Sequence, residues 1–368
     1  MYRAGHPVPR RAYLGAELPA DVEAFGDGGV RIAGVLPGGM AAAAGLAAGD
    51  VLVGIGGAPV RDREELAAAL RQAGARDIVE LTAIRVTARV AVVPAPHEPG
   101  VTLGELAVAA ARLRTLETPG ARATVVLLGG IACESLEDGP LAVIAAALAR
   151  AGYATLRVDK RGVGDSEGGP ARDVDFHTEL ADARAAVRRA TQRGLPVVVL
   201  GHSIGGVIAA HLGIAVDAIA VYGTPVRPWI DCLLDSARRQ LALHGASDAD
   251  IAHRLAEIAR LAETGELNGR SAAYHRQLAA LDLEAAWRAI AVPVLVLRGE
   301  HDWVVAADDQ ARLAELARGE LVELSGLDHV LGAHADRAAS LRDYGAGAAD
   351  PRVAEAVIAW LERATIAT

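Results

Sequence analysis

Ser203 stands between two glycines in the stretch V-L-G-H-S-I-G-G-V, which covers residues 199–207. The residues just before it, 196–200, form a short valine-rich run bounded by proline and glycine, which predicts a buried strand of a parallel sheet. The residues after it are typical of a helix. A strand that turns so abruptly into a helix strains the serine, and Gly201 and Gly205 remove side chains that would collide with the neighbouring segment. This G-x-S-x-G pattern predicts a nucleophile elbow, which raises the serine hydroxyl above the sheet.

The chemistry of such a serine requires two further groups. A serine hydroxyl is a weak nucleophile at neutral pH and needs a base that takes its proton during attack. Histidine suits this role, because the ordinary pKa of its side chain, about 6.5, lies close to neutral pH. The histidine in turn needs an acidic residue that fixes its tautomer and stabilises the imidazolium ion. With a nucleophile elbow of this kind the chain order is serine, acid, histidine.

The elements that must position these groups alternate between strands and helices. Strands are predicted at residues 124–128, 154–158, 196–200, 218–222, 292–298 and 321–324, and helices near residues 140–151, 176–193 and 353–362. A hairpin is predicted before them, at residues 105–117. The alternation predicts a mostly parallel sheet with helices on both faces.

The pattern changes between residues 224 and 290. Three helical runs, near residues 229–244, 248–264 and 271–289, interrupt the strands, and we expect no strand among them. An all-helical insertion at the carboxyl edge of a parallel sheet lies where such sheets bind ligands, so we interpret it as a lid. Trp229 is the first candidate for the substrate pocket, with burial in the core of the lid as the alternative.

A domain boundary is predicted at residues 94–100, where three prolines in seven residues break every periodic pattern. A chain of 368 residues is also too long for one ordinary core. We therefore place a first domain at residues 1–95 and a second at residues 96–368.

The first domain contains the stretch A-G-L-A-A-G-D-V-L-V-G-I-G-G at residues 44–57. A helix over residues 62–73 and an alternating strand near residues 79–86 are predicted to follow it. With these landmarks the segment from about residue 10 to residue 92 resembles a PDZ domain of the bacterial, permuted type.

This resemblance implies a peptide-binding groove. The loop that would offer backbone N–H groups to the carboxylate of a peptide C-terminus consists of Tyr13, Leu14, Gly15 and Ala16. The strand after the loop would pair with the peptide, and Arg10 or Arg11 would add a positive charge nearby. The alternative is an empty groove in a domain that only supports the rest of the protein.

From about residue 105 to residue 364 the chain resembles the α/β-hydrolase superfamily, with its motifs in the expected order. The elbow serine of the family corresponds to Ser203. In the stretch R-G-E-H-D-W-V-V the family's aspartate corresponds to Asp302, and in S-G-L-D-H-V the family's histidine corresponds to His329. The resemblance implies a nucleophile, an acid that orients the base, and a base, respectively.

The oxyanion loop of the family corresponds to the stretch L-G-G-I after the first buried strand. The resemblance implies that the backbone N–H groups of Ile131 and Ile204 form the oxyanion hole. Many members of the family carry histidine and glycine before the first of these residues, whereas Gly129 stands here in place of the histidine. The rigidity of this loop is therefore an open question.

Two of the implied residues have rivals nearby. For the acid these are Glu300, Asp308 and Asp309. For the base the rival is His334, with His301 and His202 as further histidines in the same regions.

Composition excludes several classes of partner. The net charge of −9 argues against nucleic acid, because phosphate binding requires a basic surface. No apolar stretch approaches the roughly 20 residues of a membrane span, and the first residues lack the apolar core of a secretory signal. Cys133 and Cys232 provide neither a disulfide framework nor a metal-binding set. We expect a cytoplasmic protein without metal, cofactor, nucleic-acid partner or membrane partner, and the oligomeric state stays open.

Together these features predict an α/β-hydrolase fold with a helical lid, preceded by a small, β-rich PDZ-like domain. The expected function is cleavage of an ester, thioester or amide in a small acyl substrate, through an acyl-enzyme on Ser203. One alternative is a peptide-binding module whose hydrolase domain is secondary or vestigial. Another is an acyltransferase or biosynthetic thioesterase that uses the same three residues.

Overall fold

The computed structural model describes residues 7–19, 28–344 and 349–364 of the chain. The chain forms two compact units. The first unit contains Met1–Pro99, Ala107–Arg114 and Asp159–Ala171, and the second contains Gly100–Leu106, Thr115–Val158 and Arg172–Thr368. None of the helices in the described part of the chain combines the length and the hydropathy that a membrane crossing requires.

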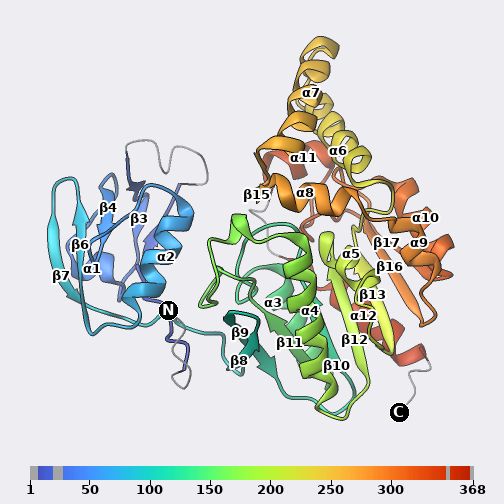
Figure 1. Ribbon diagram of the computed structural model, residues 1–368, viewed down its shortest axis with the longest axis horizontal. Helices are drawn as coiled ribbons and strands as arrows, with labels where there is room; N and C mark the ends of the chain where they lie inside the picture. Colours follow the sequence, from blue (N-terminus) through green and yellow to red (C-terminus); the bar gives the residue numbers. More distant parts are fainter. Residues whose placement is uncertain (1–6, 20–27, 345–348, 365–368) are drawn as a thin grey trace. The chain divides into compact units, whose positions relative to one another are not determined.

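The described residues of the first unit form a small antiparallel sheet and two helices (Figure 1). Its strands follow the order β2-β4-β6-β7 with β5 beside β4, and β1 and β3 pair separately. The bounds are β1 (Ala16–Glu17), β2 (Val30–Arg31), β3 (Gly34–Val35), α1 (Met40–Ala43), β4 (Val51–Ile55), β5 (Ala58–Pro59), α2 (Arg63–Ala73), β6 (Ile78–Ala83) and β7 (Thr87–Ala91). The helix and the strand predicted after residue 60 are confirmed as α2 and β6. Asp62 caps α2 by accepting a hydrogen bond from Glu65 N at 2.7 Å.

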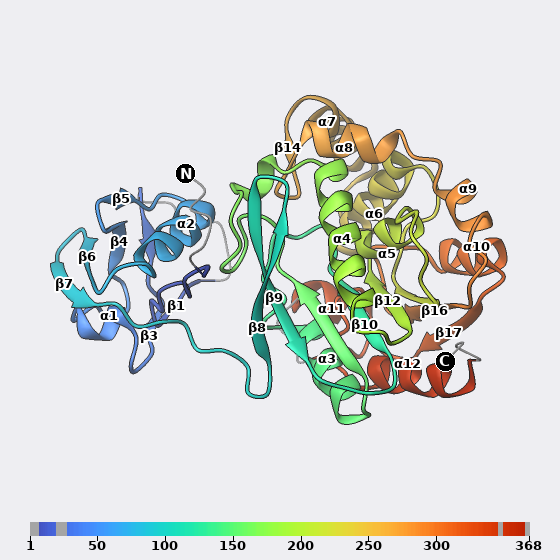
Figure 2. The ribbon, with the colours of Figure 1, turned by 60° about the horizontal axis from the view of Figure 1, so that its bottom comes forward.

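The larger sheet has eight strands in the order β17-β16-β13-β12-β10-β11-β9-β8. All of its residues except 107–108 and 111–114 belong to the second unit. The strands from β10 onward are parallel to their neighbours, and β9 is antiparallel to β11. The bounds are β8 (Thr102–Val108), β9 (Ala111–Thr118), β10 (Thr124–Leu128), β11 (Ala154–Val158), β12 (Val197–His202), β13 (Ala218–Tyr222), β16 (Val294–Gly299) and β17 (Glu320–Leu324). The predicted mostly parallel sheet is confirmed, and the predicted hairpin corresponds to β8 and β9, which lie side by side (Figure 2).

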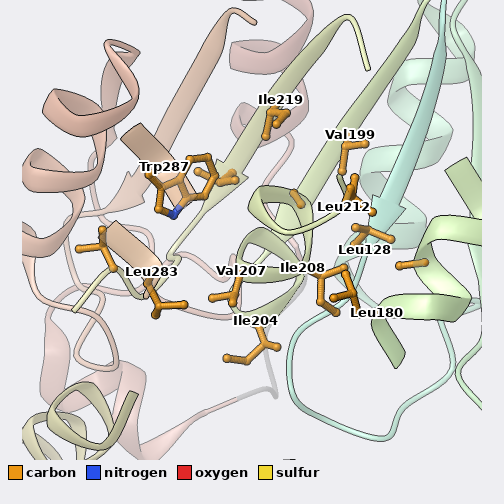
Figure 3. Packing of buried hydrophobic residues seen from close by; sticks show 14 of the residues in the cluster. Leu128, Leu180, Val199, Ile204, Val207, Ile208, Leu212, Ile219, Leu283 and Trp287 are labelled. Carbon is orange, nitrogen blue, oxygen red and sulfur yellow. The ribbon is translucent and has the colours of Figure 1, made fainter. Parts of the chain in front are cut away.

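Helices cover both faces of this sheet. Successive side chains of a strand point to opposite faces, and here both sets are apolar and need a covering layer. Val198 and Leu200 of β12 pack in one cluster with α3 and α12. Val197 and Val199 pack in a second cluster with α4, α5, α9 and α10, part of which is shown in Figure 3. The helix bounds are α3 (Pro140–Arg150), α4 (Phe176–Thr191), α5 (Ile204–Ala210), α9 (Leu283–Arg288), α10 (Ala307–Ala317), α11 (Arg337–Arg342) and α12 (Arg352–Arg363), with a 3-10 turn at Ala171–Asp173.

The insertion between β13 and β16 is the segment for which a lid is predicted, and it is called the lid below. Its helices α6 (Trp229–Leu243), α7 (Asp248–Thr264) and α8 (Ala272–Ala279) gather at one end of the second unit (Figure 1). The helical run predicted over residues 271–289 is divided into α8 and α9. The division occurs because Asp282 caps a new helix by accepting a hydrogen bond from Ala285 N at 2.9 Å.

The expectation of an all-helical insertion is wrong, because a short antiparallel hairpin separates α7 from α8. Its strands are β14 (Glu266–Leu267) and β15 (Arg270–Ser271). The two turn residues, Asn268 and Gly269, have positive φ values of 51° and 66°. Asn-Gly favours this backbone in two-residue hairpins, since the type I′ turn requires positive φ at both positions.

Candidate active site

Ser203 lies at the sharp turn between β12 and α5. Its backbone has φ 53° and ψ −119°, a combination that a residue with a side chain adopts only under strain. The turn is held by its neighbours: Ser203 N donates to Tyr222 O at 2.8 Å, and Ser203 O accepts from Gly206 N at 3.0 Å and Thr224 Oγ1 at 3.2 Å. The predicted strand, turn and helix around Ser203 are confirmed.

The steric role expected of the two flanking glycines is also confirmed. A Cβ atom at Gly201 would lie 2.5 Å from Gly206 N, and a Cβ atom at Gly205 would overlap the carbonyl oxygen of Leu128. Both obstacles are backbone atoms, so no side chain can turn away to make room. The glycines therefore let α5 pass directly against β12 and the end of β10.

Asp302 and His329 are joined by a hydrogen bond. His329 Nδ1 donates to Asp302 Oδ2 at 2.9 Å, and both residues are buried. The second carboxylate oxygen, Oδ1, accepts from Val304 N and Val305 N at 2.8 Å each. Burial alone would raise the pKa of Asp302, but the charge and hydrogen bond of His329, with the two N–H donors, lower it. Asp302 is therefore a carboxylate at neutral pH. Its hydrogen bond holds the imidazole of His329 so that Nε2 points away from the carboxylate.

The loops that carry these residues share one edge of the sheet. The elbow follows β12, Asp302 follows β16 and His329 follows β17, and the carboxyl ends of parallel strands lie at a common edge. Gly223, directly after β13, completes this arrangement with φ 58°. A Cβ atom on Gly223 would lie 2.9 Å from His329 Nδ1 and 3.0 Å from Asp302 Oδ2. Glycine is therefore needed at this position for both backbone conformation and space.

His202 connects the elbow with the loop that carries His329. Its Nε2 donates to His329 O at 2.8 Å, and the two ring centroids are 5.1 Å apart. Tyr222 at the end of β13 donates its hydroxyl to Asp328 O at 2.6 Å. Two consecutive carbonyl groups of the histidine loop are thus held by side chains at or next to the elbow strand. This brings the His329 loop to Ser203.

The rival acids make other contacts. Glu300 accepts a hydrogen bond from Gly326 N at 2.9 Å. Asp309 accepts one from Arg227 Nε at 2.5 Å, and Asp308 is exposed on α10. The hydrogen bond of His329 Nδ1 goes to Asp302.

The rival histidines also lie elsewhere. His334 Nε2 is 3.2 Å from Asp328 Oδ2, and His301 Nε2 donates to Ala335 O at 3.1 Å. Within the described ranges, no group of three or more His, Cys, Asp or Glu side chains is placed to hold a metal ion.

The glycine-rich loop after β10 passes beside the elbow. A Cβ atom on Gly130 would lie 3.4 Å from Ser203 Cβ and 3.3 Å from His202 Nδ1. Ile131, the next residue, packs against the same core cluster as Ile204, the first residue of α5. The structure therefore brings Gly130, the residue before Ile131, next to the elbow that carries Ser203 and Ile204.

Trp229 lies at the start of α6 and is buried. Its Nε1 donates to His275 Nδ1 at 3.1 Å, and the two rings are stacked. His275 Nε2 in turn donates to Leu267 O at 2.9 Å. These contacts join α6, α8 and the hairpin, whereas a place for Trp229 in a substrate pocket stays a prediction.

In the first unit, the predicted carboxylate loop of residues 13–16 is anchored on α1. The carbonyl oxygens of Tyr13 and Leu14 accept hydrogen bonds from the first turn of α1 at 3.1 and 2.8 Å. Gly15 has φ 66°, and a Cβ atom there would lie 2.6 Å from Gly39 Cα. The C=O and N–H groups of one peptide unit point in opposite directions, so the N–H groups of Leu14 and Gly15 point away from α1.

Arg10 and Arg11, which we expected to supply charge near that loop, bind a buried carboxylate. Their Nη1 atoms lie 2.9 and 3.1 Å from the Asp165 carboxylate, and Arg114 Nε lies 3.2 Å from it. Burial alone would raise the pKa of Asp165, but the hydrogen bonds and charges of Arg10 and Arg11 lower it. Asp165 therefore remains charged.

One lid arginine that was not predicted from the sequence contacts the loop that carries Asp302. Arg239 on α6 donates from Nε to Trp303 O at 2.9 Å and from Nη2 to Val304 O at 2.7 Å. These carbonyl groups follow Asp302 directly. No local pattern marks Arg239, because it stands on an ordinary amphipathic helix.

A second lid arginine, Arg270 on β15, was also missed. Its Nε donates to Ile131 O at 2.9 Å. The signal that predicts its position is the pair Asn268-Gly269, which is typical of a two-residue hairpin turn.

Comparison with known families agrees with this architecture. A family profile described as serine aminopeptidase, S33, matches residues 119–331, which include Ser203, Asp302 and His329. A PDZ domain profile matches residues 31–85. A search of curated protein sequences found no match.

Solved structures share the fold of the second unit at low sequence identity. Est1E from Butyrivibrio proteoclasticus with bound ferulic acid has a TM-score of 0.51 at 18% identity, covering 71% of this chain and 98% of its own. An esterase from Pyrococcus furiosus has a TM-score of 0.51 at 15% identity, covering 74% and 95%. The α/β hydrolase GrgF from Penicillium sp. sh18 has a TM-score of 0.51 at 17% identity, covering 73% and 99%. The predicted α/β-hydrolase fold is confirmed.

The close approach at the elbow gives a prediction for Gly205→Ala. The added methyl group would overlap the backbone of β10, so we expect the free energy of unfolding of the second unit to fall by about 3 kcal/mol, the upper end of overpacking costs. Gly194→Ala is the control, because its Cβ atom would meet no atom within 4 Å and only the left-handed backbone, with φ 69°, is strained. That strain costs about 1 kcal/mol. Urea denaturation followed by circular dichroism compares the two, and equal losses would contradict the steric role of Gly205.

Proposed function

Because the chain belongs to the serine aminopeptidase S33 family of α/β hydrolases and carries a PDZ domain, we propose that it cleaves an ester, thioester or amide through an acyl-enzyme on Ser203. The observation that carries the proposal is the hydrogen bond between His329 and Asp302, at the sheet edge where the strained Ser203 lies. In this proposal Ser203 is the nucleophile, His329 the base and Asp302 the residue that orients the base.

The proposed reaction has two halves. Ser203 Oγ attacks the carbonyl carbon of the substrate while His329 Nε2 takes the hydroxyl proton, and Asp302 stabilises the imidazolium through Nδ1–H. The tetrahedral anion collapses, the bond to the leaving group breaks, and the leaving group takes the proton from His329. Water then attacks the acyl-enzyme and gives a proton to His329. The second collapse releases the acid and returns that proton to Ser203.

The negative charge on the tetrahedral intermediate requires hydrogen-bond donors. We propose the backbone N–H groups of Ile131 and Ile204 for this role. Ile204 directly follows the nucleophile, and the approach of Gly130 to Ser203 brings the Ile131 loop to the same place. Each such donor contributes about 10² to 10³ in kcat.

We propose that the acyl group is apolar, because the lid and the loop of Ile131 carry apolar side chains that stay partly exposed. Ile131 of the oxyanion loop and several lid residues are partly buried against the core cluster: Ile230, Leu234, Leu255 and Leu267. Each CH₂ of an acyl chain that such a surface removes from water contributes about 0.8 kcal/mol to binding. Transfer to an alcohol or amine would follow the same steps with another nucleophile, and product analysis with a competing alcohol separates it from hydrolysis.

We propose that the PDZ domain binds the C-terminal carboxylate of a peptide at residues 13–16. The observation that favours this is the direction of the Leu14 and Gly15 N–H groups, which point away from α1 because their carbonyl partners are bonded to it. Adjacent N–H groups that point the same way form a site for an anion.

The nucleophile is tested with a fluorophosphonate probe, which reacts with activated serines. We expect the full chain to be labelled and Ser203→Ala to remain unlabelled, since no other group would carry the bond to phosphorus. Ser236→Ala, at a serine of α6, is the control and should be labelled like the wild type. Equal labelling of Ser203→Ala and the wild type would refute the proposal.

The acid is tested with Asp302→Asn. An asparagine keeps the shape but holds the wrong tautomer of His329, so we expect kcat for p-nitrophenyl butyrate to fall by about 10⁴-fold. Asp308→Asn, at an exposed position on α10, should leave kcat unchanged. A value for Asp302→Asn within tenfold of the wild type would exclude Asp302 as the orienting acid.

The peptide site is tested by fluorescence anisotropy with a labelled decapeptide that ends in an apolar residue. We expect micromolar binding that weakens by more than about tenfold (1.4 kcal/mol) when the C-terminus is amidated. Gly15→Ala should weaken binding of the free acid in the same way, because its added methyl group meets Gly39. Equal affinity for acid and amide would rule out carboxylate recognition by this loop.

A further inference from the structure

The hairpin of the lid places one arginine against the oxyanion loop. The side chain of Arg270 is completely buried, and its Nε donates to Ile131 O at 2.9 Å. Its Nη2 donates to Glu179 Oε2 on α4 at 2.7 Å, and its Cζ lies 4.5 Å from the ring centroid of Tyr274. The guanidinium therefore contacts the lid, the helix layer of the sheet and the loop of Ile131 at once.

The burial of this ion pair is not explained by stability. Removing two charges from water costs several kcal/mol for each ion, and apolar residues of similar size often serve stability equally well. Burial alone would lower the pKa of Arg270, but the charge and hydrogen bond of Glu179, together with the nearby Tyr274 and Cys133 side chains, raise that pKa. Arg270 thus keeps its charge, and its contact with Glu179 gives each N–H group of the guanidinium a fixed direction.

The hairpin itself is held in place on two sides. Leu267 O accepts a hydrogen bond from His275 Nε2 at 2.9 Å, and Gly269 O lies 3.7 Å from Cys133 Sγ, two residues after Ile131. The hairpin is therefore fastened both to α8 and to the segment that follows the oxyanion residue. These contacts fix the position of the backbone that carries Arg270.

The oxyanion loop needs such an anchor. Gly129 and Gly130 precede Ile131 and have no side chains that would limit their backbone freedom. A hydrogen bond to Ile131 O fixes the peptide group on the C-terminal side of Ile131, and with it the orientation of that residue. Without this hydrogen bond, motion of the loop would displace the Ile131 N–H group from the proposed oxyanion hole.

We propose that Arg270, held by Glu179, is a positioning residue that sets the orientation of Ile131 in the oxyanion hole and so links the lid to catalysis. This inference rests on the proposed function of Ile131. It predicts that loss of the Arg270 contact weakens stabilisation of the transition state while binding of the ground state changes little. A purely structural role in the lid would instead alter stability or KM.

The test variant is Arg270→Lys, measured in the full chain with p-nitrophenyl butyrate. Lysine keeps the charge for Glu179, but one ammonium nitrogen cannot replace guanidinium nitrogens that point in two directions. We expect kcat to fall by about 10²-fold with KM within about threefold, as for a slightly misplaced catalytic group. The inhibition constant of a trifluoromethyl ketone, which mimics the tetrahedral intermediate, should rise by the same factor as kcat/KM falls.

Two further variants make the result decisive. Arg276→Lys is the matched control, because Arg276 is an exposed lid arginine that donates to Glu263 O at 2.6 Å, away from the oxyanion loop. Glu179→Gln removes the support of Arg270 and should lower kcat in the same way. Rates are referred to the active sites titrated by the fluorophosphonate, so partial misfolding of one variant does not hide the effect.

The outcomes separate the two proposals. If the wild type does not react with the fluorophosphonate, the proposed function itself fails. If the wild type reacts and hydrolyses the ester but Arg270→Lys and Glu179→Gln keep kcat within threefold, only the positioning role of Arg270 is overturned. A rise in KM at constant kcat would also overturn it.

Discussion

The strained backbone of Ser203 is the constraint on which the rest of the site depends. A residue with φ 53° and ψ −119° persists only where its surroundings prevent relaxation. Here the strand β12, the hydrogen bond to Tyr222 O and the contact of α5 with β10 provide those surroundings. The last of these is possible only because Gly205 has no side chain. The core of the sheet thus maintains the one conformation that presents the serine hydroxyl at the carboxyl edge.

The loops around Ser203 are held by side chains of the sheet and of the lid. His202 and Tyr222 bind consecutive carbonyl groups of the His329 loop, so this loop is held by the side chains of β12 and β13. The lid holds two other loops: Arg239 binds carbonyl groups next to Asp302, and Arg270 binds the carbonyl group of Ile131. The two arginines thus connect this insertion with the loops that carry Asp302 and Ile131.

The sequence predicts what depends on local or repeating constraints. The elbow follows from two glycines beside a serine after a valine-rich strand, and the sheet follows from alternating strands and helices. The hairpin at Asn268 and Gly269 was missed because strands of two residues are too short to show alternation, although the turn itself carries a signal. Gly223 and Arg239 have no such signal, since their roles arise only when distant segments pack together. For the same reason, sequence gave no sign that Arg10 and Arg11 bind Asp165.

The central claim is that the hydroxyl, the imidazole and the oxyanion donors meet at one point. A crystal structure of the protein after reaction with a small fluorophosphonate tests it most directly. The account predicts phosphorus bonded to Ser203 Oγ, a phosphoryl oxygen about 2.7–3.1 Å from the N atoms of Ile131 and Ile204, and His329 Nε2 beside the adduct. An adduct on another residue, or a phosphoryl oxygen directed away from both N–H groups, would contradict it.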